Sequence, residues 1–192
     1  MANLHAIHSV GSSLIKYLRN AYPADLQRDH PCDFRLVASG EMNGKEVDFG
    51  TAVTLYLYRV NVNQYLRNSP HLNPQQQVTT PLSIDLNYLF TFWADSALAE
   101  HTILGWAVRQ LYTHQTLSQS DLTPEGGWNP GDFVQVIPNE ISNEDLMRIW
   151  DALDPGYRLS VSYVARVVRI EADAEPESPA VVSKRLHFAR GG

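Results

Sequence analysis

The sequence contains a single cysteine, Cys32, among its 192 residues. One cysteine cannot form an internal disulfide, so a secreted scaffold held by disulfides is excluded. Long apolar runs are also missing, because no stretch approaches the roughly 20 apolar residues that a membrane-spanning helix needs. The N-terminal segment does not have the order of a signal peptide, since Lys16 and Arg19 follow its apolar positions. We therefore expect a soluble protein made in the cytoplasm.

Basic residues are also scarce: 15 Lys and Arg stand against 21 Asp and Glu, for a formal charge of −6. A nucleic-acid-binding protein usually has a basic excess, so we expect no nucleic-acid partner. Hydrophobic residues make up 44% of the chain, enough for the core of one domain. We expect this domain over residues 1–171, followed by a linker and a C-terminal tail or edge strand over 172–192.

Sequence motifs of common catalytic sites are absent. The glycine-rich segment 125–132, EGGWNPGD, has neither a Walker A lysine nor the G-x-G-x-x-G pattern of a dinucleotide site. Neither the nucleophile elbow G-x-S-x-G nor the zinc motif H-E-x-x-H occurs. Catalytic groups can still converge from distant positions, but the sequence gives no positive sign of an enzyme. We expect no catalysis, no cofactor and no small-molecule substrate.

The histidines and the cysteine are the remaining candidates for chemistry. His5 and His8 lie three residues apart at a helix start and could reach one metal, but nothing specifies the further ligands. We interpret them as a solvated helix start and predict no metal site. His101 falls on the predicted apolar face of its helix, which favours a neutral core histidine. No local signature activates Cys32, which favours a buried or incidental thiol.

Alternating and helical patterns predict an α+β fold, with a mostly antiparallel sheet and helices packed against it. Helices are expected within the first 22 residues with Asn3 as N-cap, over 97–114 capped by Asp95 or Ser96, and after a capping-box-like start at Ser142. The expected strands are 34–38, 52–60, 83–93, 133–137 and 158–171, with 180–188 as a possible last edge strand. Both faces of 52–60 are apolar, so we expect it to be covered on both sides.

Two aromatic residues lie in predicted loops, where no core position is evident. Tyr65 belongs to the polar connection 61–81, and Trp128 belongs to the glycine-rich loop. Loop aromatics of this kind can anchor a partner protein. They can equally fold back as a lid on their own domain, and the sequence leaves both interpretations open.

Several segments, in this order, resemble the N-terminal domain of the cap, or tail-terminator, proteins of contractile injection systems. An N-terminal helix leads into LYLYRVNVNQYLRN (55–68), PLSIDLNYLFTFWA (81–94) and EHTILGWAVRQLYTH (100–114), followed by LMRIWDAL (146–153) and LSVSYVARVVRIE (159–171). The most specific parts are Leu-Tyr-Arg-Val followed by Leu-Arg-Asn, and Leu-x-Tyr-Leu leading to Glu-His-x-x-Leu-Gly. The resemblance covers residues 3–171. The family includes proteins of the antifeeding prophage and the Photorhabdus virulence cassettes.

The resemblance implies a non-catalytic, tail-terminator-like protein that forms a six-fold ring. Such a ring ends the inner tube, contacts the last sheath layer and stops growth, within a particle assembled in the cytoplasm. Its implied partners are other copies of itself, the inner tube protein and the sheath protein. Some family members carry an extra C-terminal portion, whereas only 172–192 follow the domain here.

A closed ring needs a head-to-tail contact, for which sheet edges and long loops are well suited. The candidate segments are 61–81, 117–132 and the tail 180–188. Arg59 and Arg67 could pair with carboxylates of a neighbouring subunit, or could simply be solvated. The full set of interface candidates is Arg59, Tyr65, Arg67, Trp128, Val181, Val182 and Phe188.

Two other functions remain open at this stage. The chain could be another tube or baseplate-adaptor component of the same kind of particle, in which case a tube protein would polymerise indefinitely. The less favoured alternative is a metal-dependent hydrolase that uses His101, or His5 and His8.

Overall fold

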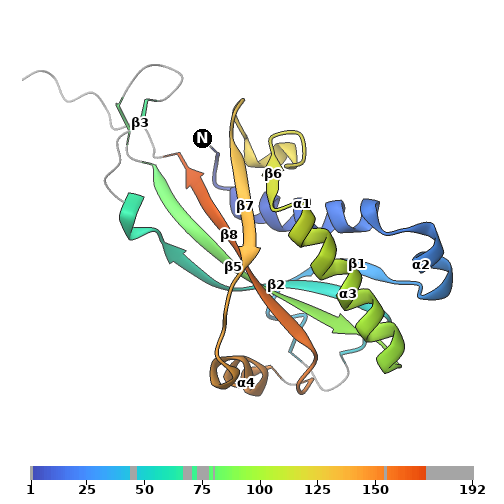
Figure 1. Ribbon diagram of the computed structural model, residues 1–192. Helices are drawn as coiled ribbons and strands as arrows, with labels where there is room; N and C mark the ends of the chain where they lie inside the picture. Colours follow the sequence, from blue (N-terminus) through green and yellow to red (C-terminus); the bar gives the residue numbers. More distant parts are fainter. Residues whose placement is uncertain are drawn as a thin grey trace, which may run out of the picture.

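The computed structural model describes residues 2–43, 47–66, 71–72, 78–79, 81–153 and 155–171. Its main sheet has six strands in the order β1-β2-β5-β8-β7-β6, and β3 and β4 form a separate two-stranded sheet (Figure 1). The elements are α1 (Ala6–Ala21), α2 (Ala24–Asp29), β1 (Asp33–Val37), β2 (Ala52–Val62), η1 (Gln64–Leu66), β3 (His71–Leu72), β4 (Val78–Thr79), β5 (Leu82–Trp93), α3 (Ala97–Thr113), β6 (Thr116–Ser118), η2 (Pro124–Gly126), β7 (Phe133–Pro138), α4 (Asn143–Ala152) and β8 (Ser160–Ile170).

The sheet is antiparallel at every described strand pair except one. Only β1 and β2 run parallel, with Phe34 opposite Val53 and Leu36 opposite Leu55. The central strands β2, β5 and β8 are long and antiparallel to their neighbours. The predicted α+β class with a mostly antiparallel sheet is therefore confirmed.

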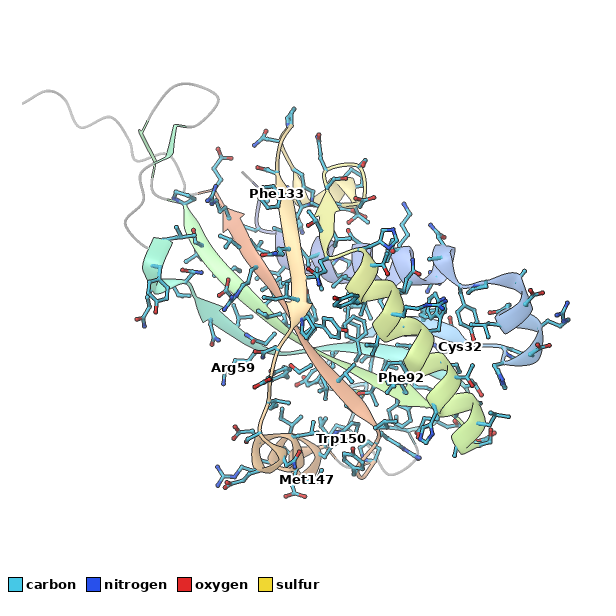
Figure 2. The ribbon with its side chains drawn as sticks, in the orientation of Figure 1. Cys32, Arg59, Phe92, Phe133, Met147 and Trp150 are labelled. Carbon is cyan, nitrogen blue, oxygen red and sulfur yellow. The ribbon has the colours of Figure 1, made fainter. Side chains whose placement is uncertain are left out.

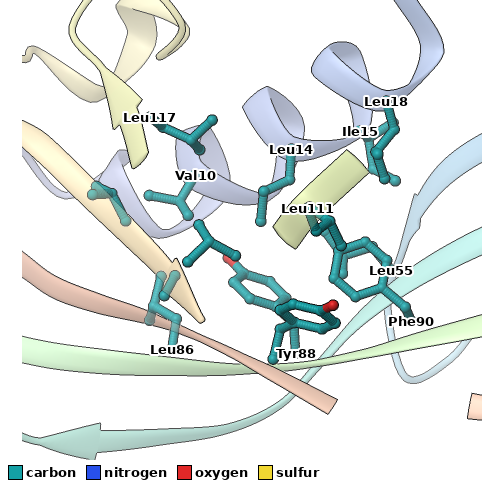
Figure 3. Packing of buried hydrophobic residues seen from close by; sticks show 14 of the residues in the cluster. Val10, Leu14, Ile15, Leu18, Leu55, Leu86, Tyr88, Phe90, Leu111 and Leu117 are labelled. Carbon is teal, nitrogen blue, oxygen red and sulfur yellow. The ribbon is translucent and has the colours of Figure 1, made fainter. Parts of the chain in front are cut away.

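Helices α1 and α3 cover one face of the sheet and enclose the larger hydrophobic cluster. Val10, Leu14 and Leu18 of α1 are at most 1% exposed and point towards the strands. Alternate residues of β5, including Tyr88 and Phe90, meet them from the sheet (Figure 3). Apolar residues at every second position of a strand, and at every third or fourth position of a helix, lie on one side of the element. These sides of the strands and helices face each other here.

Helix α4 covers part of the opposite face and encloses a second, smaller cluster. Trp93 of β5 and Trp150 of α4 are 4% and 2% exposed, and their ring centroids lie 6.5 Å apart. Ala52, in the first half of β2, belongs to this cluster, whereas the next residue, Val53, belongs to the larger one. The prediction that 52–60 is covered on both sides is confirmed for the first half of β2. It is wrong for the end of that range, where Arg59 and Val60 are exposed because β1 does not extend along them.

Two serine caps are confirmed. Ser96 accepts a hydrogen bond from the Ala99 N–H at 3.2 Å, and Ser142 accepts one from the Asp145 N–H at 3.0 Å. Each cap satisfies a backbone donor that has no partner inside its helix.

The predicted cap at Asn3 is wrong, because α1 begins three residues later, at Ala6 with His5 as its N-cap. The Asn3 side-chain oxygen accepts from the His5 N–H at 2.8 Å, while the backbone N–H of Asn3 donates to the Gly126 carbonyl. Ala2 pairs with Ile170 at the end of β8. These long-range bonds tie residues 2 and 3 to β8 and to η2, so the helix cannot start there.

The predicted burial of His101 is also wrong. Its side chain is 69% exposed, with Nε2 3.9 Å from a Glu100 carboxylate oxygen. Helix α3 buries Ile103, Ala107 and Leu111, at intervals of four residues. His101 precedes Ile103 by two positions, or about 200° around the helix axis, which places it on the solvent side.

Candidate functional site

The thiol of Cys32 is buried against the larger cluster, at 8% exposure. Its Sγ lies 3.4 Å from the Asp33 carbonyl oxygen. Burial raises the pKa of this thiol to about 12. A thiol that stays protonated at neutral pH is a poor nucleophile and a poor metal ligand. Cys32 therefore has the surroundings of a structural cysteine.

We expect the burial of Cys32 to make the protein less stable in alkali. The folded thiol keeps its proton to a higher pH than the unfolded thiol, so its contribution is complete below the ordinary cysteine pKa. That contribution is lost as the pH rises from there towards about 12. Urea unfolding between pH 8 and 11 should show a shallower decline for Cys32→Ala than for the unchanged chain. Equal slopes for the two proteins would contradict this account.

The histidines in the described part of the chain do not assemble into a metal centre. His5 and His8 are both exposed at the start of α1, and the Ser12 hydroxyl lies 3.4 Å from Nε2 of His8. Among the residues that the structure describes, no group of three or more His, Cys, Asp or Glu side chains could hold a metal ion. The hydrolase alternative gains no support from this arrangement.

Trp128 folds back onto its own domain. Its indole Nε1 donates to the Ser9 hydroxyl of α1 at 2.9 Å, and its ring packs against the larger cluster. A Cβ at residue 126 would lie 2.3 Å from the same Nε1, so only glycine fits beneath the ring. The sequence left two interpretations open for Trp128, an anchor for a partner protein or a side chain that folds back over its own domain. This geometry agrees with the second.

The segment around Trp128 is tied to α1 by further hydrogen bonds. The Thr123 N–H donates to the Ser13 hydroxyl at 2.8 Å, and the Ser9 hydroxyl donates to the Thr123 carbonyl at 2.8 Å. Ser9 and Ser13 are fully buried, which strengthens these bonds relative to exposed ones. This part of the predicted loop 117–132 is therefore a fixed surface, with β6 and η2 as short elements within it.

Two of the predicted interface residues are exposed near the end of β2. Tyr65, in η1, is 97% exposed and packs against nothing in the larger or smaller cluster. Arg59 is exposed on β2, and Figure 2 shows its side chain directed away from the core. Arg67, Val181, Val182 and Phe188 lie outside the described residues, as do the linker and tail at 172–192.

A shallow hollow with two arginines was not predicted from the sequence. It has a volume of about 330 Å³ and lies over β7 and β8, where Trp128, Phe133, Arg166 and Arg169 line it. Phe133 is 63% exposed. Arg166 Nε lies 3.8 Å from an Asp85 carboxylate oxygen, across a bulge between β5 and β8. The bulge shifts the alternation of β8, which is why the outward position of Arg166 and Arg169 on one face could not be derived from sequence.

Comparison with known families gives a match to the model described as the Pvc16 N-terminal domain, over residues 9–184. The chain belongs to the Pvc16 N-terminal domain family. The family resemblance predicted from the sequence is therefore confirmed. No curated protein matches the chain.

Two solved structures share the fold of this Pvc16 N-terminal domain. One is the sheath/tube terminator of an extracellular contractile injection system, PVC, in the extended state: TM-score 0.57, 20% identity, and coverage of 97% of this chain and 64% of the other. The second is the cap of the anti-feeding prophage, named as the AFP tube terminating cap: TM-score 0.55, 16% identity, and coverage of 95% and 59%. The chain thus spans about three-fifths of each of these proteins.

The described part of this Pvc16-type fold exposes several aromatic and basic side chains. In the described part of the chain, no helix is long and apolar enough to cross a membrane. Tyr65 and Arg59 are exposed at the end of β2, and Phe133, Arg166 and Arg169 are exposed over β7 and β8. Exposed aromatic and arginine side chains of this kind are suited to binding other proteins.

Proposed function

We propose that this chain is the cap, or terminator, of a contractile injection particle. It forms a ring of six copies on the last layer of the inner tube, contacts the last sheath layer and prevents further growth. It catalyses no reaction. The observation that carries the proposal is the family match over nearly the whole chain, together with the shared fold of two proteins that are named as a terminator and a tube terminating cap.

Termination places a physical requirement on the two ends of such a ring. One end must match the last tube layer, and the other must not reproduce that layer, or stacking would continue. A closed ring also needs a contact between two different surfaces of neighbouring copies. The sheet of this chain has unlike edges and unlike faces, which supports such an arrangement.

We expect removal of this chain from the particle to change the tube length. Electron microscopy of particles assembled without it should show over-long or variable tubes, whereas adding it back should restore one length with density closing one end. An unchanged length distribution would refute the proposal. Indefinite polymerisation of the purified chain into tubes would instead identify it as a tube component.

A further inference from the structure

The second half of β2 has an open edge. Strand β1 pairs with Ala52–Tyr56 only, whereas β2 continues to Val62 along β5. Beyond Tyr56, no strand in the described part of the chain lies on the other side of β2. We call this stretch, residues 57–62, the free edge.

Backbone hydrogen-bonding groups of the free edge point outwards. The Asn63 N–H donates to the Ser83 carbonyl at 2.8 Å, towards β5. Because this direction alternates along an antiparallel strand, the N–H and C=O groups of Val60 and Val62 point away from β5. The side chains of these two valines are 44% and 51% exposed. Within the described part of the chain, the free edge thus presents main-chain groups without a strand partner together with apolar side chains.

The neighbouring edge of the sheet is protected, in contrast. On β1, the Phe34 N–H donates to the Asp33 carboxylate at 2.8 Å, and the Phe34 carbonyl accepts a hydrogen bond from Arg19. Side chains therefore occupy both main-chain groups of Phe34, which a further strand on β1 would use. Proteins usually block open edges in this way, because an unblocked edge recruits other chains. An unblocked edge with two exposed valines is the arrangement expected of a binding site.

The sequence contains a segment of matching chemistry. Residues 180–188 read AVVSKRLHF, a short run with the two β-branched residues Val181 and Val182 and no glycine or proline. It follows the acidic, proline-containing stretch 172–179, ADAEPESP, which favours neither a helix nor a strand. Addition of an extended segment to a sheet edge gains main-chain hydrogen bonds without needing a preformed pocket.

We propose that residues 180–188 of a second copy of this chain add to the free edge of β2 as a further strand. Each copy then offers one acceptor edge and one donor segment, which are different surfaces. Contacts of this head-to-tail kind generate closed rings when the rotation is right. The inference rests on the proposed cap function, for which it supplies the contact between neighbouring copies.

The topology favours a second copy over the chain's own tail. Ile170 of β8 pairs with Leu82, and Val62 of β2 pairs with Ile84, so both strands finish at the same end of the sheet. The connection 63–81 between β2 and β5 leaves this end as well. To reach the free edge of its own domain, the tail would have to pass around that connection, and connections at one end of a sheet rarely cross. A tail that arrives from outside meets no such obstacle.

Disulfide formation between two full-length variants tests this pairing. One variant carries Val62→Cys. In a second set of variants, one of the residues 181–186 is replaced by cysteine in each. Cys32 is retained because its thiol is buried. When the two variants are mixed, we expect a disulfide-linked heterodimer to form. Because neighbouring residues of a strand face opposite sides, its yield should rise and fall with a period of two residues along positions 181–186. The best positions should exceed the Leu98→Cys control, a site 71% exposed on α3, by tenfold or more.

Three results would overturn the proposal: no position above the control, cross-linking without a period of two, or a disulfide confined to single chains that carry both cysteines. A second variant, Val60→Lys, places a charge on the free edge and should reduce cross-linking about tenfold, whereas Leu98→Lys should not. If the chain makes tube lengths uniform but the disulfide does not form, the strand pairing alone is refuted. If the disulfide forms but adding or removing the chain leaves tube length unchanged, the cap function alone is refuted.

Discussion

Replacing Phe92 with alanine is expected to lower the free energy of unfolding by about 3–5 kcal/mol. Phe92 lies on the central strand β5, is 1% exposed, and faces the cluster under α1 and α3 (Figure 2). Its cross-strand partner on β2 is Val53, which is fully buried. Truncation would leave a cavity in the middle of the sheet that flanking strands cannot close without losing their pairing.

Phe133→Ala is the matched control, because it removes the same atoms from a side chain that is 63% exposed on β7. Its cost should stay within about 0.5–1 kcal/mol. Urea unfolding of the purified chains, followed by circular dichroism, measures both. In a thermal melt the core variant should lose about 2–4 °C for each kcal/mol. Similar losses for the two variants would contradict the assignment of Phe92 to the core.

Replacing Trp150 with alanine is expected to detach α4 from the sheet, at a local cost of about 3–5 kcal/mol. Trp150 is the buried residue of this helix, at 2% exposure, and its ring packs edge-on against Trp93 and Tyr157. A helix of 10 residues is marginal on its own in water, so it depends on this contact. The larger cluster lies on the opposite face and should remain folded.

Amide hydrogen exchange, measured for each residue, distinguishes local unfolding of α4 from unfolding of the whole domain. In Trp150→Ala we expect protection to vanish over Asn143–Ala152 and to persist in β5. Met147→Ala on the same helix, at 41% exposure, is the control and should leave α4 protected. Protection of α4 in both variants would show that Trp150 does not hold the helix.

Trp150→Phe should cost less than the alanine variant. Among the described residues, the indole Nε1 of Trp150 is buried without a hydrogen-bond partner. An unsatisfied buried donor costs about 1–3 kcal/mol, so phenylalanine would remove this penalty while it keeps most of the ring contact.

Local patterns predicted most of the elements that build the sheet. The strand predicted at 83–93 is observed at Leu82–Trp93, and the one at 133–137 at Phe133–Pro138. The serine caps were predicted correctly because each is a local interaction: Ser96 and Ser142 accept a hydrogen bond from the N–H group three residues further along the chain. The short elements α2 and β6 were missed, since six and three residues are too few to establish a period. Tyr65 was correctly placed outside the core, whereas the end of β2 was expected to be covered on both sides and instead exposes Arg59 and Val60.

By itself, the sequence determined the α+β class, the antiparallel character of the sheet and the family, because these depend on alternation, capping and motif order along the chain. Only the tertiary structure decided which edge of β2 stays open, that Trp128 closes over Ser9, and that His101 faces solvent. Those features depend on contacts between distant residues: Ser9 and Trp128 are 119 positions apart. No periodicity within one element encodes such a contact, since it is created only when the sheet and α1 come together.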